Sequence, residues 1–157
     1  METRERELFD YRDGKLYWKV SCGRITAGQE AGSVGGHGYR QIGYDYKKRR
    51  THRVIWAYHY GEIQKGFFID HINRDPLDNR IENLRLCNKT QNAGNSNLRV
   101  DNKLGVKGVD FKKGKFRVQI RKQGKKLHLG LFDTAEEAHA AYLKAAVEIF
   151  GEFSCGG

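Results

Sequence analysis

The side chains best suited to chemistry lie between Phe67 and Asn95, in the stretch FFIDHINRDPLDNRIENLRLCNKTQNAGN. An apolar run ends there on Asp70 and His71, and asparagines follow at positions 73, 79, 83, 88, 92 and 95. Asparagine is a mediocre helix former and a poor strand former, and it is favoured in caps and turns. The number of asparagines beside two apolar strands therefore raises the question of what chemistry they serve.

Histidine and hard oxygen atoms together suit the hydrolysis of a phosphodiester. Histidine, with an ordinary pKa of about 6.5, can act as a general base on water near neutral pH, which makes His71 a candidate. A cation is also needed to neutralise charge on the phosphate and on the leaving oxygen. The carboxylate of Asp70 and the carbonyl oxygen of Asn92 favour Mg²⁺ or Mn²⁺ over Zn²⁺, so we expect one such ion and no further cofactor.

Two strands and a helix must position these groups. We predict strands over 67–70 and 83–87 and a helix over 88–95, which Asn88 would cap. This arrangement could bring His71 and Asn92 together across one small cleft. Asn95 competes with Asn92 as the metal ligand, since helix boundaries read from sequence shift by a residue or two.

Simpler interpretations exist for each of these residues taken alone. An isolated Asp-His pair is usually structural, and asparagines near turns are usually caps. His52 could contact a phosphate, although a hydrogen-bonding role at a helix start is the favoured interpretation. The catalytic hypothesis rests on the base, the oxygen ligands and a separate basic region occurring together in one short chain.

The basic region lies in the last third of the chain. The stretch 115–121 alternates apolar and polar residues, and 126–131 repeats the pattern with Leu127, Leu129 and Leu131 on its apolar side. A third strand, 108–112, and a helix that Thr134 begins and Gly151 ends complete a three-stranded antiparallel sheet packed on one helix.

Charge on the other face of this sheet is one-sided. The chain carries a net charge of +10, and residues 103–126 contain ten Lys or Arg against a single acid, Asp110. Such a balance predicts attraction to a polyanion, and an Arg- and Gln-bearing face suits the major groove of DNA. A charged face that only keeps the protein dissolved is the alternative.

Two families resemble parts of this sequence. The stretch from Gly105 to Ser154 resembles an AP2 DNA-binding domain, with landmarks GV at 108–109, HLGLFDTAEEA at 128–138 and AY at 141–142. Plant members carry Arg where Asp110 stands and Trp where His128 stands, so their recognition sequence does not transfer. The resemblance implies double-stranded DNA contacts from Lys107, Arg117, Gln119, Arg121, Lys126 and His128. Lys112 and Lys113 lie near a turn and are expected to meet phosphates.

The stretch from about Leu8 to Asn95 is similar to phage HNH endonucleases, whose core is a ββα-metal finger. PLDNRIENLR at 76–85 is the most specific part, and phage homing endonucleases share the spacing of His71, Asn83 and Asn92. The resemblance implies that His71 is the general base and that Asn83 holds the loop and so orients it. It also implies that Asp70 and Asn92 bind the metal.

These observations predict an α+β chain with a nuclease domain over 1–97 (core 67–97), a linker over 98–104 and an AP2-like domain over 105–157. Glycine-rich, β-rich structure is expected before the finger. The expected function is a metal-dependent homing-type DNA endonuclease that nicks one strand or cuts both, leaving 5′-phosphate and 3′-hydroxyl ends. The alternatives are a DNA-binding regulator with an inactive HNH fold and an RNA-binding or RNA-cleaving protein.

The remaining features bear on the cellular context. Three scattered cysteines, at positions 22, 87 and 155, favour neither a disulfide framework nor a zinc site. Neither a signal peptide nor an apolar run of membrane-spanning length is apparent. We therefore expect a cytoplasmic protein, in the host cell if it is phage-encoded, with no membrane association and no evident protein partner.

Overall fold

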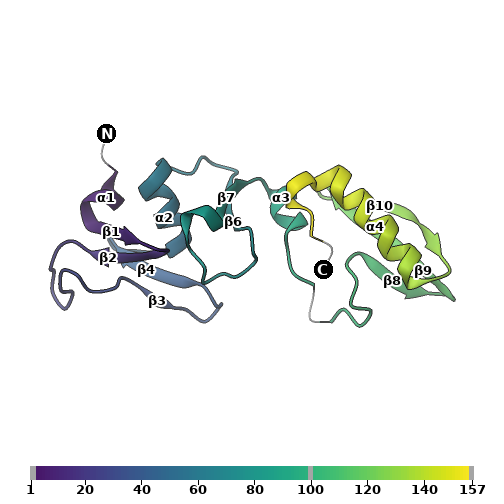
Figure 1. The fold of residues 1–157 in the computed structure, drawn as a ribbon, viewed down its shortest axis with the longest axis horizontal. Coiled ribbons are helices and arrows are strands. Elements are labelled where there is room, and N and C mark those ends of the chain that lie inside the picture. Colours follow the sequence, from purple (N-terminus) through teal and green to yellow (C-terminus); the bar gives the residue numbers. More distant parts are fainter. Residues whose placement is uncertain (1–2, 99–100, 156–157) are drawn as a thin grey trace. The chain divides into compact units, whose positions relative to one another are not determined.

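The computed structural model describes residues 3–98 and 101–155 (Figure 1). The chain divides into two compact units, Met1–Leu86 and Cys87–Gly157. Each unit contains both helices and strands, so the expected α+β class is confirmed. No helix within the described ranges combines the length and apolar character needed to span a membrane.

The first unit surrounds helix α2 with short strands. Its elements are α1 (Arg4–Leu8), β1 (Phe9–Arg12), β2 (Lys15–Trp18), β3 (Ser33–Val34), β4 (Arg40–Tyr44), β5 (Lys47–Arg50), α2 (Thr51–Tyr60), β6 (Phe68–His71), the 3₁₀ turn η1 (Ile81–Asn83) and β7 (Leu84–Cys87). Strands pair as β1-β2, β3-β4-β5 and β6-β7. The glycine-rich stretch that precedes β4 contributes only the two residues of β3 to a sheet.

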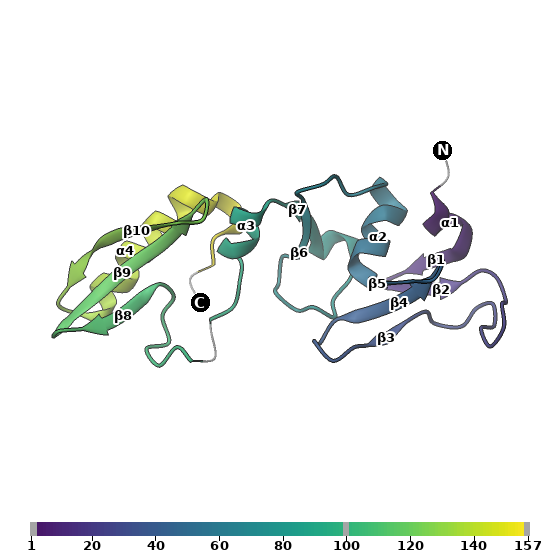
Figure 2. The same ribbon diagram turned by 180° about the vertical axis from the view of Figure 1, so that it is seen from behind.

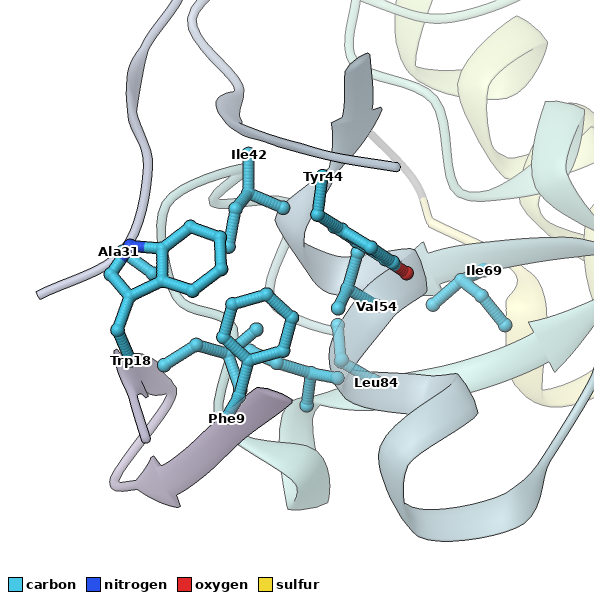
Figure 3. Packing of buried hydrophobic residues seen from close by; sticks show 10 residues of the cluster. Phe9, Trp18, Ala31, Ile42, Tyr44, Val54, Ile69 and Leu84 are labelled. Atoms are coloured by element: carbon cyan, nitrogen blue, oxygen red, sulfur yellow. The ribbon is translucent and has the colours of Figure 1, made fainter. Parts of the chain in front are cut away.

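A single apolar core fixes these small sheets to α2. Phe9, Leu16 and Ile42 come from three different strands and pack with Ile55 of α2, and all are almost fully buried. Figure 3 shows Phe9 and Ile42 in this cluster with Val54 of α2. The rings of Phe9 and Trp18 lie 4.6 Å apart between centroids. Burial of such side chains is the main favourable term in folding. The same cluster includes residues of β6 and β7, so it also anchors the strands that carry the candidate site.

The second unit is a sheet covered by one long helix. Its elements are α3 (Lys89–Gly94), β8 (Val109–Lys112), β9 (Lys115–Lys122), β10 (Lys125–Phe132), α4 (Ala135–Phe150) and η2 (Gly151–Phe153). The three strands are antiparallel in the order β10-β9-β8, and α4 runs along them (Figure 2). The hydroxyl of Thr134 accepts a hydrogen bond from the Glu137 N–H at 3.2 Å, and Gly151 caps the other end of α4.

One strand face differs from its prediction. The register of β10 shifts between His128 and Gly130, where a bulge adds a residue. Because side chains alternate along a strand, one extra residue moves all later ones to the opposite face. Leu131 therefore pairs with Arg117 and is exposed, although the sequence pattern placed it on the apolar side with Leu127 and Leu129. Of those two, Leu129 is partly buried against the second core, whereas Leu127 is 39% exposed.

The helix of the expected finger packs in the second unit. The Asn88 side chain caps α3 and forms a capping box with Gln91, as the sequence indicated. At the other end of α3, Gly94 lies directly against Phe150, and Cys87 is buried in the second core. The compact units divide between Leu86 and Cys87, eleven residues before the end of the predicted nuclease domain at 97. The predicted linker, 98–104, includes residues 99–100, which lie outside the described residues.

Because of this packing, Gly94→Ala should change the stability of the protein in the direction opposite to that expected from helix propensity. A Cβ atom there would lie 2.7 Å from Cγ of Phe150 and 2.9 Å from the carbonyl oxygen of Phe153. Helix propensity alone predicts that Gly94→Ala stabilises the protein by about 1 kcal/mol. We expect the opposite, a loss of about 1–3 kcal/mol from overpacking, measured by hydrogen exchange of α4 amides. Slower exchange in α4 would contradict this packing of α3.

Candidate active site

Asp70 and His71 end strand β6, and a twelve-residue excursion returns the chain to β7. The backbone N–H of Ile72 donates to the carbonyl of Asn83 at 2.9 Å, which closes the base of this loop. His71 is only 6% exposed although it is polar. A buried polar ring requires hydrogen-bond partners, so the loop around it decides what the ring can do.

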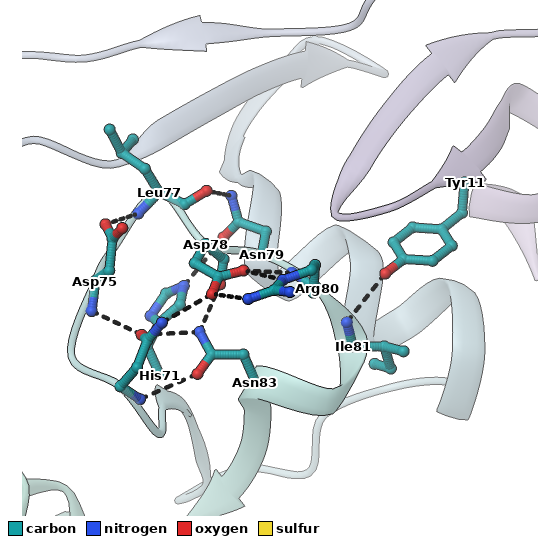
Figure 4. Close-up of polar contacts among 10 residues, drawn as sticks. Tyr11, His71, Asp75, Leu77, Asp78, Asn79, Arg80, Ile81 and Asn83 are labelled. Carbon is teal, nitrogen blue, oxygen red and sulfur yellow. Dashed lines mark hydrogen bonds and ion pairs between the residues drawn. The ribbon is translucent and has the colours of Figure 1, made fainter.

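Asn83 holds the two sides of the loop together. Its Oδ1 accepts from the backbone N–H of Asn73 at 3.0 Å, and its Nδ2 donates to Oδ1 of Asn73 at 2.9 Å and to the carbonyl of Asp78 at 2.7 Å (Figure 4). Asp78 in turn pairs with Arg80. Hydrogen bonds from Arg80 lower the pKa of Asp78 to about 2, so this carboxylate stays ionised and keeps the turn closed.

Asn79 contacts the His71 ring directly, which sequence reasoning missed. Its Oδ1 lies 3.0 Å from Nε2 of His71, while its Nδ2 donates to the carbonyl of Leu77 at 3.2 Å. The second bond fixes the amide orientation, so the oxygen faces the ring and Nε2 must donate. In this tautomer Nδ1 carries the lone pair that a base uses. Asn79 is 2% exposed, and its position within the loop that Asn83 closes was the available signal.

Two more rings pack around His71. His52, in the first turn of α2, lies 4.9 Å from His71 between ring centroids at 86°, and the Tyr39 ring lies 6.2 Å from His71. Burial, and then the charge that His71 would carry, lower the pKa of His52 to about 3. His52 is therefore neutral at physiological pH and fills space beside the base without adding charge.

Asp70 already faces a cation. Its Oδ2 accepts from Nε of Arg85 on β7 at 3.0 Å, and the two side chains are only 10% and 16% exposed. Sequence reasoning missed Arg85. A buried carboxylate beside the candidate base has the charge and the hard oxygen atoms that a divalent cation requires, so this half of the expected metal site fits. Within the described residues no three His, Cys, Asp or Glu side chains form a metal-binding cluster, and the expected set contains only one carboxylate.

The two candidate second ligands lie on and beside α3 in the other unit. Asn92 is on the helix and is exposed, whereas Asn95 is the C-cap residue and is buried. The pairing of Asp70 with either one stays a prediction.

The outer face of the second sheet gathers most of the basic residues predicted to bind DNA. Val118 and Ile120 of β9 are buried toward α4, so the residues that alternate with them face outward. Cross-strand pairs extend this face, with Lys126 opposite Arg121 and His128 opposite Gln119. We name as the outer face the residues Arg117, Gln119, Arg121, Lys126 and His128. A hollow of about 730 Å³ beside it is lined by Gln119, Arg121 and Lys126, with Leu104 and Phe111 among its apolar walls.

The remaining residues predicted to contact DNA differ in whether their charged groups are already bonded within the protein. Lys112 and Lys113 are exposed at the β8-β9 turn, as expected. Nζ of Lys107 instead donates to the carbonyls of Gly94 at 2.8 Å and Ser96 at 2.6 Å, which satisfies the end of α3. We therefore leave Lys107 out of the proposed DNA contacts. Arg117 donates from Nε to Asp110 at 2.8 Å, so its guanidinium is held on the outer face by a carboxylate.

Known proteins match this chain over the loop between β6 and β7 and over the segments on either side of it. The HNH endonuclease family matches residues 49–94, which include His71, Asn79 and Asn83. Protein 3.8 of Escherichia phage T7 is 32% identical over 118 residues, which cover 74% of this chain and 94% of that protein. The uncharacterized HNH endonuclease L560 of Acanthamoeba polyphaga mimivirus is 32% identical over 122 residues, covering 77% of this chain and 63% of that protein.

A solved structure, described as DNA binding and cleavage by the HNH homing endonuclease I-HmuI, covers 92% of this chain and 78% of its own at 20% identity, with a TM-score of 0.43. The assignment of this chain to a family rests on the sequence similarities, not on this structure. The chain belongs to the HNH endonuclease family and is a nuclease of that family.

Proposed function

We propose that this nuclease is a metal-dependent, homing-type endonuclease that hydrolyses phosphodiester bonds in double-stranded DNA to 5′-phosphate and 3′-hydroxyl ends. One observation carries the proposal: a buried histidine, His71, whose Nε2 is held by Asn79 and whose neighbour Asp70 is a buried carboxylate. A base of fixed tautomer beside a cation-binding oxygen is the pair of groups that this reaction requires. We expect the protein to act in the cytoplasm of a host cell.

The proposed roles follow from this geometry. His71 removes a proton from water through Nδ1 while Asn79 holds the opposite ring nitrogen. Asn83 keeps the loop closed and so keeps Asn79 in place. Asp70 and Asn92 would hold one Mg²⁺ or Mn²⁺, which when bound would neutralise charge on the phosphate. Of the two asparagines we choose Asn92 as ligand, because its side chain is exposed while that of Asn95 is buried.

A plasmid-nicking assay tests the proposal directly. Supercoiled plasmid should be nicked or linearised with Mg²⁺, and an excess of chelator should stop the reaction. End-labelling before and after phosphatase treatment identifies 5′-phosphate ends. Binding without cleavage under every divalent cation would favour the alternative, a DNA-binding regulator. One observation favours that alternative: the Arg85 guanidinium contacts the Asp70 carboxylate, which is the proposed metal ligand.

Asn79 offers a sharper test of the base. We predict that Asn79→Ala lowers the maximal cleavage rate by about 10- to 100-fold and leaves DNA affinity unchanged, because the ring loses its orienting acceptor but the basic surfaces remain. Asn79→Asp keeps an oxygen that accepts from Nε2–H but loses the donor to the Leu77 carbonyl, so it should retain more activity than Asn79→Ala and less than the parent. The measurement is single-turnover cleavage at saturating enzyme. Equal losses in both variants would mean that Asn79 serves only to fold the loop.

We further propose that residues 105–157 of the second unit form the AP2-like DNA-binding module and that the outer face contacts bases. Arg121→Ala should relax base preference by about 1–3 kcal/mol at one position of the site. Lys113→Ala, at the turn, should weaken binding to all sequences alike and reduce the salt slope by about one unit. Binding of site and non-site duplexes across a salt series separates the two. Identical behaviour of the two variants would remove base reading from this face.

A further inference from the structure

The β4-β5 hairpin has an unusual residue at its tip. Four hairpins in the described ranges close with two residues of positive φ, and in three of them the second residue is glycine: Asp13-Gly14, Lys113-Gly114 and Gln123-Gly124. In the fourth, between Tyr44 and Lys47, the pair is Asp45 with φ of 48° and Tyr46 with φ of 58°. Turns of this type favour glycine because a Cβ atom is strained there, most of all on a bulky residue.

The Tyr46 side chain contributes nothing to the fold. It is 109% exposed, the full area of an extended reference, whereas the neighbouring Tyr44 is buried. In the described part of the chain no hydrogen bond or ring contact from Tyr46 is present. A backbone strain kept without any packing benefit points to a role outside the folded chain.

The surroundings of Tyr46 specify the chemistry of the partner. The segment 47–53 contains five Lys or Arg and no acid. Lys47 and Lys48, next to the tip, are exposed, whereas Arg49 folds back to donate to the carbonyl of Tyr44 at 2.7 Å. A hollow of about 870 Å³ beside β5 is lined by Lys48, Arg50 and Arg53, with Glu5 and Glu62 among its other residues. An exposed aromatic ring flanked by flexible cations complements a polyanion that carries flat apolar surfaces.

We propose that Tyr46 packs its ring against the bases of duplex DNA while Lys47 and Lys48 contact the flanking phosphates. The hairpin is then a second DNA-contacting element, in the nuclease unit itself and separate from the outer face of the second unit. Two-stranded ribbons fit the grooves of DNA, and inserted apolar side chains hold a duplex by partly unstacking a step. This role does not read sequence, because every base offers a similar flat surface. It deepens the proposed function by naming how the first unit holds its substrate.

The test uses the full chain and a random-sequence 30-base-pair duplex in chelator, so that no cleavage occurs. Tyr46→Ala keeps a Cβ atom at the strained position and removes the ring, and we expect its affinity to fall by roughly 10-fold or more with an unchanged salt slope. Lys47→Ala should instead reduce the salt slope by about one unit. Tyr60→Ala is the control, an exposed tyrosine at the last residue of α2 in the same unit, and should bind like the parent.

Two further variants separate the ring from the backbone. Tyr46→Gly restores the residue that the other hairpins use, so it should melt no earlier than the parent and yet lose affinity like Tyr46→Ala. Tyr46→Trp should keep affinity, and its new fluorescence should be quenched when duplex is added. Parental affinity in both Tyr46→Ala and Tyr46→Gly would overturn the proposal, as would tighter binding of single-stranded DNA or RNA by the parent. The parent could also bind duplex without nicking it, while these variants lose affinity. That result would support the role of Tyr46 and contradict the proposed metal-dependent cleavage of duplex DNA.

Discussion

His71→Ala should lower the rate of plasmid nicking by about 10²–10⁴-fold and leave duplex affinity within about two-fold of the parent. The reason is that alanine cannot accept the proton of the attacking water. The cations proposed to hold DNA belong to other elements, the outer face and strand β5. Cleavage under single-turnover conditions and binding in chelator measure the two effects separately.

His37→Ala is the matched control for His71→Ala. His37 is an exposed histidine of the same unit, in the glycine-rich segment, and its removal should change neither quantity. His71 is buried against His52, so His71→Ala could disturb the packing. His71→Gln therefore serves as a second variant, with a side chain of similar size that can still form hydrogen bonds. If either His71 variant cuts at a rate within a few-fold of the parent, His71 is not the base.

The sequence nominated residues for the candidate site but did not predict all of their contacts. Asp70, His71 and Asn83 stand at fixed positions relative to two strands, and the alternation and spacing of the chain are enough to predict that. The bond from His71 to Asn79 depends on the path of the loop between them, which hydrogen bonds within the loop decide. Arg85 could not be paired with Asp70 from sequence because the register of β6 on β7 is a property of the folded sheet.

One element that was not predicted has an atypical composition. The segment KKRR at 47–50 forms strand β5, although four consecutive cations do not suggest a strand. It is stabilised by pairing with β4 and by the stacking of Arg49 on Tyr44 and of Arg50 on Tyr39, at 4.0 and 4.3 Å. Tertiary contacts of this kind override local preference. The outer face, in contrast, follows simple alternation and was predictable until the bulge in β10.

The boundary between the two units also depends on tertiary contacts that the sequence does not reveal. Composition changes near residue 93. A domain boundary placed there assumes that all residues of the catalytic finger also pack in the first unit. Gly94 instead allows α3 to lie against Phe150, so a helix that the proposed mechanism needs is packed with the second unit. A fragment that begins at 98 would lack α3 and leave that surface uncovered, so fragments for binding studies should begin at Cys87.

Asp70→Ala should abolish Mg²⁺-dependent nicking to the same degree as His71→Ala, but for a different reason. The variant keeps the base and loses a hard oxygen ligand, so part of its activity should return at high Mn²⁺, which binds such sites more tightly. Asn92→Ala should behave similarly and Asn95→Ala should be milder. Binding of Mn²⁺, followed by electron paramagnetic resonance, should weaken in Asp70→Ala and be unchanged in His71→Ala.

The Arg85 contact complicates this variant and also supplies its control. Removing one member of a nearly buried ion pair can cost about 3–5 kcal/mol, so Asp70→Ala alone could lose activity by unfolding. Asp70→Ala combined with Arg85→Met removes both charges and should recover most of the stability without recovering activity or Mn²⁺ affinity. Thermal unfolding and Mn²⁺ titration of the single and double variants distinguish the two causes. If the double variant nicks plasmid with Mg²⁺ at the parental rate, the ion binds elsewhere and Asp70 serves only to pair with Arg85.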